Sequence, residues 1–182
     1  MSTGLLEDMR DGVEVHLAPL TVVQYRQMIR DGILSDGEPI ELIQGALLYK
    51  DRRDQSGGIM TREPRHLRAL NKLTALLSKW VESRNAFLQV QGPIVVSPNS
   101  EPEPDCCLVR GTPDDFGDDV PRAADVLAVF EVAFSSLQSD RRTKQRLYAV
   151  AGIPLYIIVN LQENLIEVLS QPSPDAGRYE MH

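Results

Sequence analysis

The 182-residue sequence predicts a single α/β (α+β) domain, a mixed β-sheet flanked by helices, and three observations support this prediction. Short apolar runs of strand length alternate with stretches whose apolar residues recur every three or four positions, as on one face of a helix. The run at 123–131 shows little alternation, which is typical of a strand buried on both faces. The chain is 42% hydrophobic, long enough for one core, and contains no repeat or linker. We therefore expect an N-terminal segment at 1–19, a domain at 20–170 and a frayed C-terminal tail at 171–182.

The first part of the domain is expected to form a helix, a hairpin and a second helix. Thr21 can cap the first helix, because its hydroxyl can accept a hydrogen bond from the first turn. Residues 39–49 follow as a hairpin or a bent strand, with Gly45 at the turn or bulge. The charged, glycine-containing residues 51–60 are expected to be a mobile loop. The second helix spans 64–83 and begins with a proline, which suits a first turn.

The remaining residues are expected to form strands and loops around one further helix. Gly152, which is followed shortly by a proline, ends that helix. The expected elements are strands at 87–90, 94–96, 106–109 and 123–131, an acidic loop at 111–122, a helix at 136–151, and a hairpin of strands at 155–159 and 165–169.

Charge and hydropathy restrict the classes of function. The formal net charge of -7 disfavours nucleic-acid binding, because phosphate contacts need clustered cations. The basic residues do gather at 52–53, 62–72 and 141–146, where they form either a binding patch or an ordinary solvated surface. No run approaches the roughly 18 apolar residues of a membrane span, and no signal pattern opens the chain. These absences predict a cytoplasmic protein without membrane partners.

The two cysteines, Cys106 and Cys107, are adjacent. Neighbouring side chains on a strand point to opposite faces, which disfavours a disulfide or a shared metal site. We expect both to be buried free thiols in a reducing compartment.

Two acids lie at the ends of predicted strands. Asp105 begins one strand, and Glu131 ends another after five apolar residues. If the two strands pair antiparallel, the carboxylates converge at one edge of the sheet, where they could hold Mg²⁺, which prefers oxygen ligands. Asp105 alone is better explained as a turn or cap residue after Pro104. Glu131 is harder to explain without a site, because a buried acid is costly unless it is paired or binds a metal.

Further candidates lie on the helix that follows Glu131. Lys144 pairs with Asp140 at i,i+4 spacing, which as a surface ion pair contributes about 0.3–0.5 kcal/mol. Alternatively, its ammonium points back at the carboxylates, where it could stabilise a transition state or orient a water. Tyr148 shares that helix face, and packing alone could explain it.

Two candidates come from the N-terminal half. Glu41 lies inside an apolar strand, where it either supplies a third carboxylate, for a second metal or an outer-shell water, or points to solvent. His66 lies in the first turn of its helix among arginines, at the end that favours anions. A lone histidine there is also common as a surface residue, so a substrate or outer-shell role is one of two alternatives.

Taken in order, these residues resemble the Uma2 family of restriction-endonuclease-like proteins, within the PD-(D/E)XK phosphodiesterase superfamily. The resemblance covers roughly 20–169, and its most specific part is 131–160. The residues that carry it are Glu41-Leu42-Ile43-Gln44-Gly45, His66, Pro104-Asp105, Glu131-Val132, Ser135-Ser136-Leu137, Asp140-Arg141, Lys144, Tyr148-Ala149, Ala151-Gly152-Ile153-Pro154 and Val159-Asn160.

The resemblance implies a restriction-endonuclease-like fold, dependence on Mg²⁺ or Mn²⁺, a nucleic-acid partner, expected to be DNA, and a homodimer. By the same resemblance, Asp105 and Glu131 are metal ligands, and Glu41 matches the family's early acid. Lys144 takes the role of the superfamily's lysine from the following helix, because the usual position of that lysine holds Ala133.

The chain departs from the family pattern at two positions. Phe134 and Leu155 stand where polar or acidic residues are expected, and Phe134 follows the ligand strand closely. The leading hypothesis is a metal-dependent endonuclease, with a catalytic set of Glu41, Asp105, Glu131 and Lys144. The alternative is a nucleic-acid-binding or assembly protein without turnover, which the acidic net charge and Phe134 favour. A metal phosphoesterase acting on small nucleotides is a third hypothesis.

Overall fold

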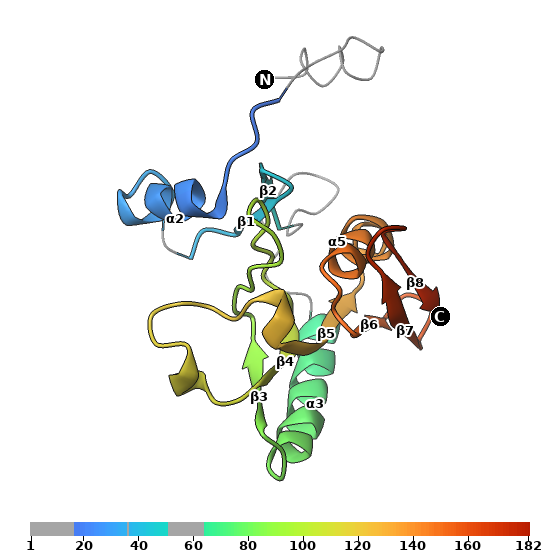
Figure 1. Ribbon diagram of the computed structural model, residues 1–182. Coiled ribbons are helices and arrows are strands. Elements are labelled where there is room, and N and C mark those ends of the chain that lie inside the picture. The colour runs from blue at the N-terminus through green and yellow to red at the C-terminus, as the bar shows by residue number, and fades with distance from the viewer. Residues whose placement is uncertain (1–16, 36, 51–63) are drawn as a thin grey trace, which may run out of the picture.

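The computed structural model describes residues 17–35, 37–50 and 64–182 (Figure 1). Most of the expected N-terminal segment and the loop expected at 51–60 therefore lie outside the described residues. Helix α2 (Val22–Arg30) opens the described part. Its cap is the expected Thr21: the hydroxyl of Thr21 accepts from the Gln24 amide at 3.2 Å, and the Gln24 side chain accepts from the Thr21 amide at 2.9 Å.

The predicted hairpin is present as strands β1 (Ile40–Ile43) and β2 (Ala46–Tyr49), which pair antiparallel. Gln44 and Gly45 form its turn, with φ angles of 51° and 81°. Two left-handed residues are what a two-residue turn of the type I′ class needs. Gly45 also lies against the backbone of the 17–20 segment, so that a Cβ atom there would be 2.7 Å from the Cα atom of Pro19.

We expect Gly45→Ala to destabilise the protein more than Gly32→Ala does. Both glycines have positive φ, so both substitutions bear a left-handed strain of about 1–2 kcal/mol. Only at Gly45 does the added methyl group overlap a neighbour, Pro19, which adds about 1 kcal/mol or more. Urea unfolding followed by far-UV circular dichroism measures both losses. Equal losses would show that the 17–20 segment moves away freely.

Six strands form the main sheet, in the order β3-β4-β5-β6-β7-β8. Strands β5 and β6 pair parallel and all other neighbours pair antiparallel, so the sheet is mixed, as predicted. The strands are β3 (Ala86–Val90), β4 (Cys106–Arg110), β5 (Val126–Ala133), β6 (Leu155–Asn160), β7 (Leu165–Ser173) and β8 (Arg178–Met181).

Helices cover both faces of this sheet (Figure 1). Helix α3 (Pro64–Val81) packs through Leu70 on one face, against a cluster that includes Phe130 of β5. On the other face, helix α5 (Gln145–Val150) packs against a cluster that includes Val129. Neighbouring residues of β5 are thus buried on opposite faces, which confirms the two-sided burial predicted from its sequence.

Two predicted elements differ in the structure. The run at 94–96 is no regular strand; Val95 forms an isolated bridge with Arg122 instead. The helix expected at 136–151 is divided into a short α4 (Leu137–Ser139), a π-helical turn η3 (Asp140–Lys144) and α5. The expected acidic loop contains the short 3₁₀ helix η1 (Pro113–Asp115) and is followed by η2 (Ala123–Asp125).

The expectation of a frayed tail from residue 171 is wrong. Strand β7 continues to Ser173, and β8 pairs with it, placing Tyr179 opposite Pro172. The Tyr179 ring is buried in the core, and its hydroxyl donates to the carbonyl of Ile153 at 2.9 Å. This burial outweighs the effect of the proline and glycine residues that suggested disorder.

The cysteines are both free and fully buried, as predicted. Cys106 belongs to the cluster under α3 and Cys107 to the cluster on the opposite face. Burial, together with nearby negative charge, raises the pKa of each thiol to about 12. Within the described part of the chain, no helix has the length and apolar character needed to cross a membrane.

Candidate active site

Asp105 and Glu131 lie beside each other, because β4 and β5 pair antiparallel with Cys106 opposite Phe130. The Glu131 carboxylate accepts from the Asp105 amide at 3.3 Å. In return, Oδ2 of Asp105 accepts from the Val132 amide at 2.8 Å. The antiparallel pairing assumed from the sequence is therefore present, and hydrogen bonds hold the two acids next to each other where β4 begins and β5 ends.

Glu131 is almost fully buried, with 4% of its surface exposed. Its Oε1 atom accepts two hydrogen bonds, from Lys144 Nζ at 2.9 Å and from the Tyr148 hydroxyl at 3.1 Å. Tyr148 is both packed in the core and bonded to the acid, so the packing and functional interpretations of this residue are not exclusive. A carboxylate held by two donors on one oxygen has a fixed orientation.

Lys144 points into the molecule. Besides Glu131, its ammonium lies 3.8 Å from Oε1 of Glu41, and its side chain is 14% exposed. Among the described residues its ion pairs are with these two acids, so the surface pair with Asp140 does not form. Burial alone lowers the pKa of Lys144, but Glu131, Glu41 and Asp140 outweigh burial and raise it. Lys144 therefore carries its charge throughout the neutral range.

The π-helical turn η3 directs Lys144 inward. A π-helical turn contains more residues than an α-helical turn of the same height, so the residues after it are rotated relative to a regular helix, and such turns are frequent at functional sites. Lys144 ends η3, and Tyr148 follows it one turn later in α5. The regular helix expected from the sequence contains no such turn.

Glu41 reaches the same place from the hairpin. It is buried, Oε1 faces Lys144, and Oε2 accepts from the Glu103 amide at 3.2 Å. The solvent-facing interpretation of Glu41 is therefore wrong. The hairpin is held there by a bridge between Leu42 and Glu101, two residues before Glu103. This long-range bridge explains why the local sequence pattern could not place Glu41.

His66 lies on the other side of Asp105. Its Nε2 atom is 3.0 Å from Oδ2 of Asp105. Burial raises the pKa of Asp105, but His66 and the Val132 amide outweigh it, so the net pKa is lowered. Asp105 is thus ionised at neutral pH. The Nδ1 atom of His66 is buried without a hydrogen-bond partner among the described residues.

Asp140 is 1% exposed and lies at the start of η3. Its Oδ2 atom accepts from the Ser136 hydroxyl at 2.6 Å, whereas Oδ1 is buried without a partner in the part of the chain described. Burial is the main cause that raises the pKa of Asp140. Ser136 is the residue of this group that the sequence analysis did not single out as a candidate; its i,i+4 spacing from Asp140 was the available signal.

The donor set suits a hard divalent cation. Four buried or half-buried acids surround Lys144, and burial, together with Asp140 and Asp105, raises the pKa of Glu131. An added cation would relieve this excess of negative charge. No three His, Cys, Asp or Glu side chains of the described residues are grouped to hold an ion by themselves. Mg²⁺ commonly takes one or two carboxylates and keeps several waters, so the pair Asp105 and Glu131 fits it.

Leu155, one of the two departures from the family pattern, lies away from this site. Leu155 packs with the cluster under α3, on the face opposite to Tyr148. Phe134 follows β5, and its carbonyl accepts from the Gln162 side chain. It thus helps to join the ends of β5 and β6.

Comparison with known proteins agrees with this architecture. The family model Uma2, described as "Putative restriction endonuclease", matches residues 23–182. A crystal structure of a nuclease described as putative and belonging to DUF820, from Anabaena variabilis, is similar in fold with a TM-score of 0.59. The two chains are 14% identical, and the match covers 85% of this chain and 86% of that one. A search of the curated proteins found no match.

Proposed function

This chain belongs to the Uma2 family of restriction-endonuclease-like proteins, and from this premise we propose that it is a metal-dependent endonuclease. The substrate would be a phosphodiester bond of nucleic acid, most simply DNA. One observation supports the proposal above others: a buried, charged Lys144 lies between Glu131 and Glu41, and Glu131 is joined to Asp105. The expected DNA substrate and homodimeric state rest on the family resemblance alone, and the expected cytoplasmic location rests on the hydropathy of the sequence.

In this proposal Asp105 and Glu131 hold Mg²⁺ or Mn²⁺ at the edge of β4 and β5. The ion, when bound, would polarise a phosphoryl oxygen and make its water a better nucleophile. Asp105 is ready to bind a cation because its pKa is already lowered. His66 and the Val132 amide fix one oxygen of Asp105, and the other oxygen accepts no hydrogen bond from the described residues, so it can face the ligand.

Lys144 would counter the negative charge that develops on the phosphoryl oxygens during attack. Its position is set before substrate arrives, because Glu131 and Glu41 hold the ammonium from two sides. A preorganised charge in a buried site stabilises a transition state more than a mobile surface charge does. Tyr148 and Asp140 would have positioning roles, the first on Glu131 and the second through the turn that carries Lys144.

The second candidate function is nucleic-acid binding or assembly without turnover. The net charge of -7 and the internal pairing of Lys144 with two acids favour it. The two candidates differ in one measurable property. An endonuclease must cut when a divalent cation is supplied, whereas a binding protein must not.

Cleavage of supercoiled plasmid and of single-stranded DNA, with Mg²⁺, with Mn²⁺ and with EDTA, tests the proposal. We expect cutting that needs the cation and that is lost in Glu131→Gln. Glu180→Gln is the matched control, because Glu180 is an exposed acid on β8 that bonds only Arg178 among the described residues. Absence of cleavage by the wild-type protein across both substrates and both metals would favour the binding candidate.

A further inference from the structure

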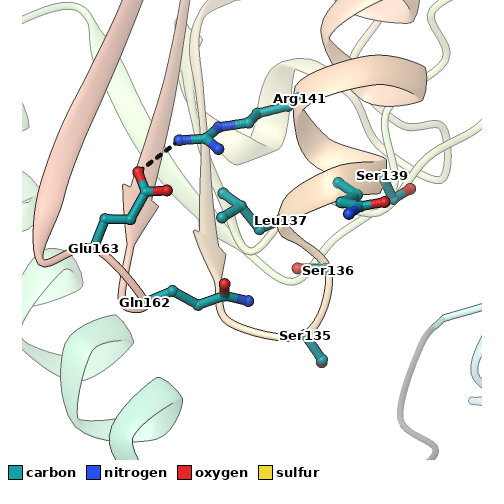
Figure 2. Close-up of a pocket in the computed structure, with 8 residues that line it drawn as sticks. Ser135, Ser136, Leu137, Ser139, Arg141, Gln162 and Glu163 are labelled. Carbon is teal, nitrogen blue, oxygen red and sulfur yellow. Dashed lines mark hydrogen bonds and ion pairs between the residues drawn. The ribbon is translucent and has the colours of Figure 1, made fainter.

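A polar pocket of about 610 Å³ opens where the parallel strands β5 and β6 end. Figure 2 shows Leu137 at its centre, with the turn that carries Gln162 and Glu163 on one side and the segment 135–139 on the other. The volume lies within the roughly 300–1,000 Å³ typical of small-molecule sites. The lining residues are Ser135, Ser136, Leu137, Gln138, Ser139, Arg141, Gln162 and Glu163.

The lining offers uncharged donors and acceptors. Ser135, Gln138 and Ser139 line the pocket, are exposed, and have no hydrogen-bond partner among the described residues. The charge of Arg141 is already neutralised, because its guanidinium bonds Glu163 at 2.8 Å and Glu167 at 2.9 Å. A phosphate group would therefore find no available cation here. Hydroxyls and carboxamides instead match the donor and acceptor pattern on the edge of a nucleobase.

The pocket borders the active site. Glu131 is four residues before Ser135, so the near wall lies within roughly 13 Å of the candidate active site along the chain. That is the length of a few nucleotides at roughly 3.4 Å or more each. The two places also share a hydrogen bond, because Ser136, which lines the pocket, donates to the buried Asp140. A strand cut at the candidate active site would therefore have a base within reach of this pocket.

We propose that this pocket binds an unpaired base of the substrate strand, close to the bond that is cut. The Watson–Crick edge of a base in a continuous duplex is already paired, so this edge can enter such a pocket only after the base leaves the helix. The protein therefore acts on single-stranded or locally opened nucleic acid in preference to intact duplex. The choice of a nucleic-acid ligand rests on the proposed nuclease function, but the binding test does not require cleavage.

The test measures binding in EDTA, where no cleavage occurs. Fluorescence anisotropy compares a 5′-labelled oligothymidylate with an abasic strand of equal length, so that the number of phosphates is the same. We expect the wild-type protein to bind the base-containing strand about tenfold more tightly, as for one well-bonded base edge. Equal affinity for the two strands, or no binding to either, would overturn the inference without any variant being needed.

A double variant then assigns the effect to the pocket. Gln138→Leu/Ser139→Ala removes two of the three unpartnered side chains at similar side-chain volume, and we expect the preference for the base-containing strand to fall severalfold. The matched control Gln27→Leu/Ser78→Ala makes the same exchanges at exposed helical positions of α2 and α3 and should keep the preference. If the double variant, folded by circular dichroism, keeps the preference, the pocket is not the base site.

A cleavage assay on the same two oligonucleotides and on a matched duplex separates the two proposals. Cutting without base preference supports the nuclease proposal and overturns the proposal that the pocket binds a base. Base preference without cutting supports the pocket and counts against the nuclease.

Discussion

Asp105→Asn is expected to reduce metal-dependent cleavage by at least about a hundredfold, and the affinity for Mn²⁺ by a similar factor. The carboxamide that replaces the acid is a neutral, weaker ligand for a hard cation. Stability should change little, because the carboxamide oxygen can still accept from the Val132 amide, which lies 2.8 Å from Oδ2 of Asp105 in the wild-type protein. Single-turnover cleavage and calorimetric titration with Mn²⁺ measure the two losses, and urea unfolding measures stability.

Asp118→Asn is the control for this substitution. Asp118 is an exposed acid in the 111–122 loop, so the same chemical change there should leave cleavage and Mn²⁺ affinity unaltered. A folded Asp105→Asn protein that binds Mn²⁺ as tightly as wild type would remove Asp105 from the ligand set. Asp105 would then have only a structural role, through its hydrogen bond with the Val132 amide.

Lys144→Met is expected to have the largest effect on stability, a loss of about 3–5 kcal/mol in the free energy of unfolding near pH 8. The substitution keeps an unbranched apolar chain but leaves Glu131 and Glu41 buried without their cation. The same variant should lose cleavage, because no other ammonium in the described part of the chain stands between these acids. Lys79→Met, at an exposed position of α3, is the control.

The loss from Lys144→Met should depend on pH in a known direction. In the wild type, Lys144 lowers the pKa of Glu131, whereas burial and the neighbouring acids raise it. Without Lys144, the pKa of Glu131 in the folded variant therefore rises still further above its unfolded value. A raised acid pKa gives stability that is complete below the unfolded value and declines as pH increases. The difference from wild type should therefore be smaller at pH 5 than at pH 8. A difference that grows towards pH 5 would contradict the buried-charge explanation.

A double-mutant cycle with Glu131→Gln isolates the pair. Replacing both partners removes both buried charges, so Lys144→Met/Glu131→Gln should be less destabilised than the sum of the single variants. Strict additivity would indicate that Glu131 and Lys144 do not interact in solution, despite the 2.9 Å between them.

Local signals in the sequence identified most elements of the fold. The Thr21 cap, the glycine turn of the hairpin and the proline at the start of α3 each act within a few residues, so a pattern can show them. The approach of Asp105 to Glu131 was also predictable, because two antiparallel neighbours bring a strand start to a strand end.

The remainder depends on contacts between distant segments. The π-helical turn arises where Lys144 must reach Glu131, and a periodicity of 3.6 residues does not reveal it. The apolar run at 94–96 matches a strand in composition, but in the structure it forms an isolated bridge from Val95 to Arg122 and single backbone hydrogen bonds from Ile94 and Val96 to neighbouring turns. Strand β8 is short and polar, and its order follows from its pairing with β7 and from the burial of Tyr179. The burial of Glu41 likewise follows from where the hairpin docks.

The separate hairpin affects when the candidate active site is completed during folding. Glu41 belongs to a two-stranded sheet with its own small apolar cluster, apart from the six strands that carry Asp105 and Glu131. If Glu41 takes part in the proposed cleavage, a chain that has completed only the larger sheet would not yet cut DNA, because Glu41 is placed only when the hairpin docks. In a refolding time course, cutting should therefore return later than the bulk of the far-UV signal.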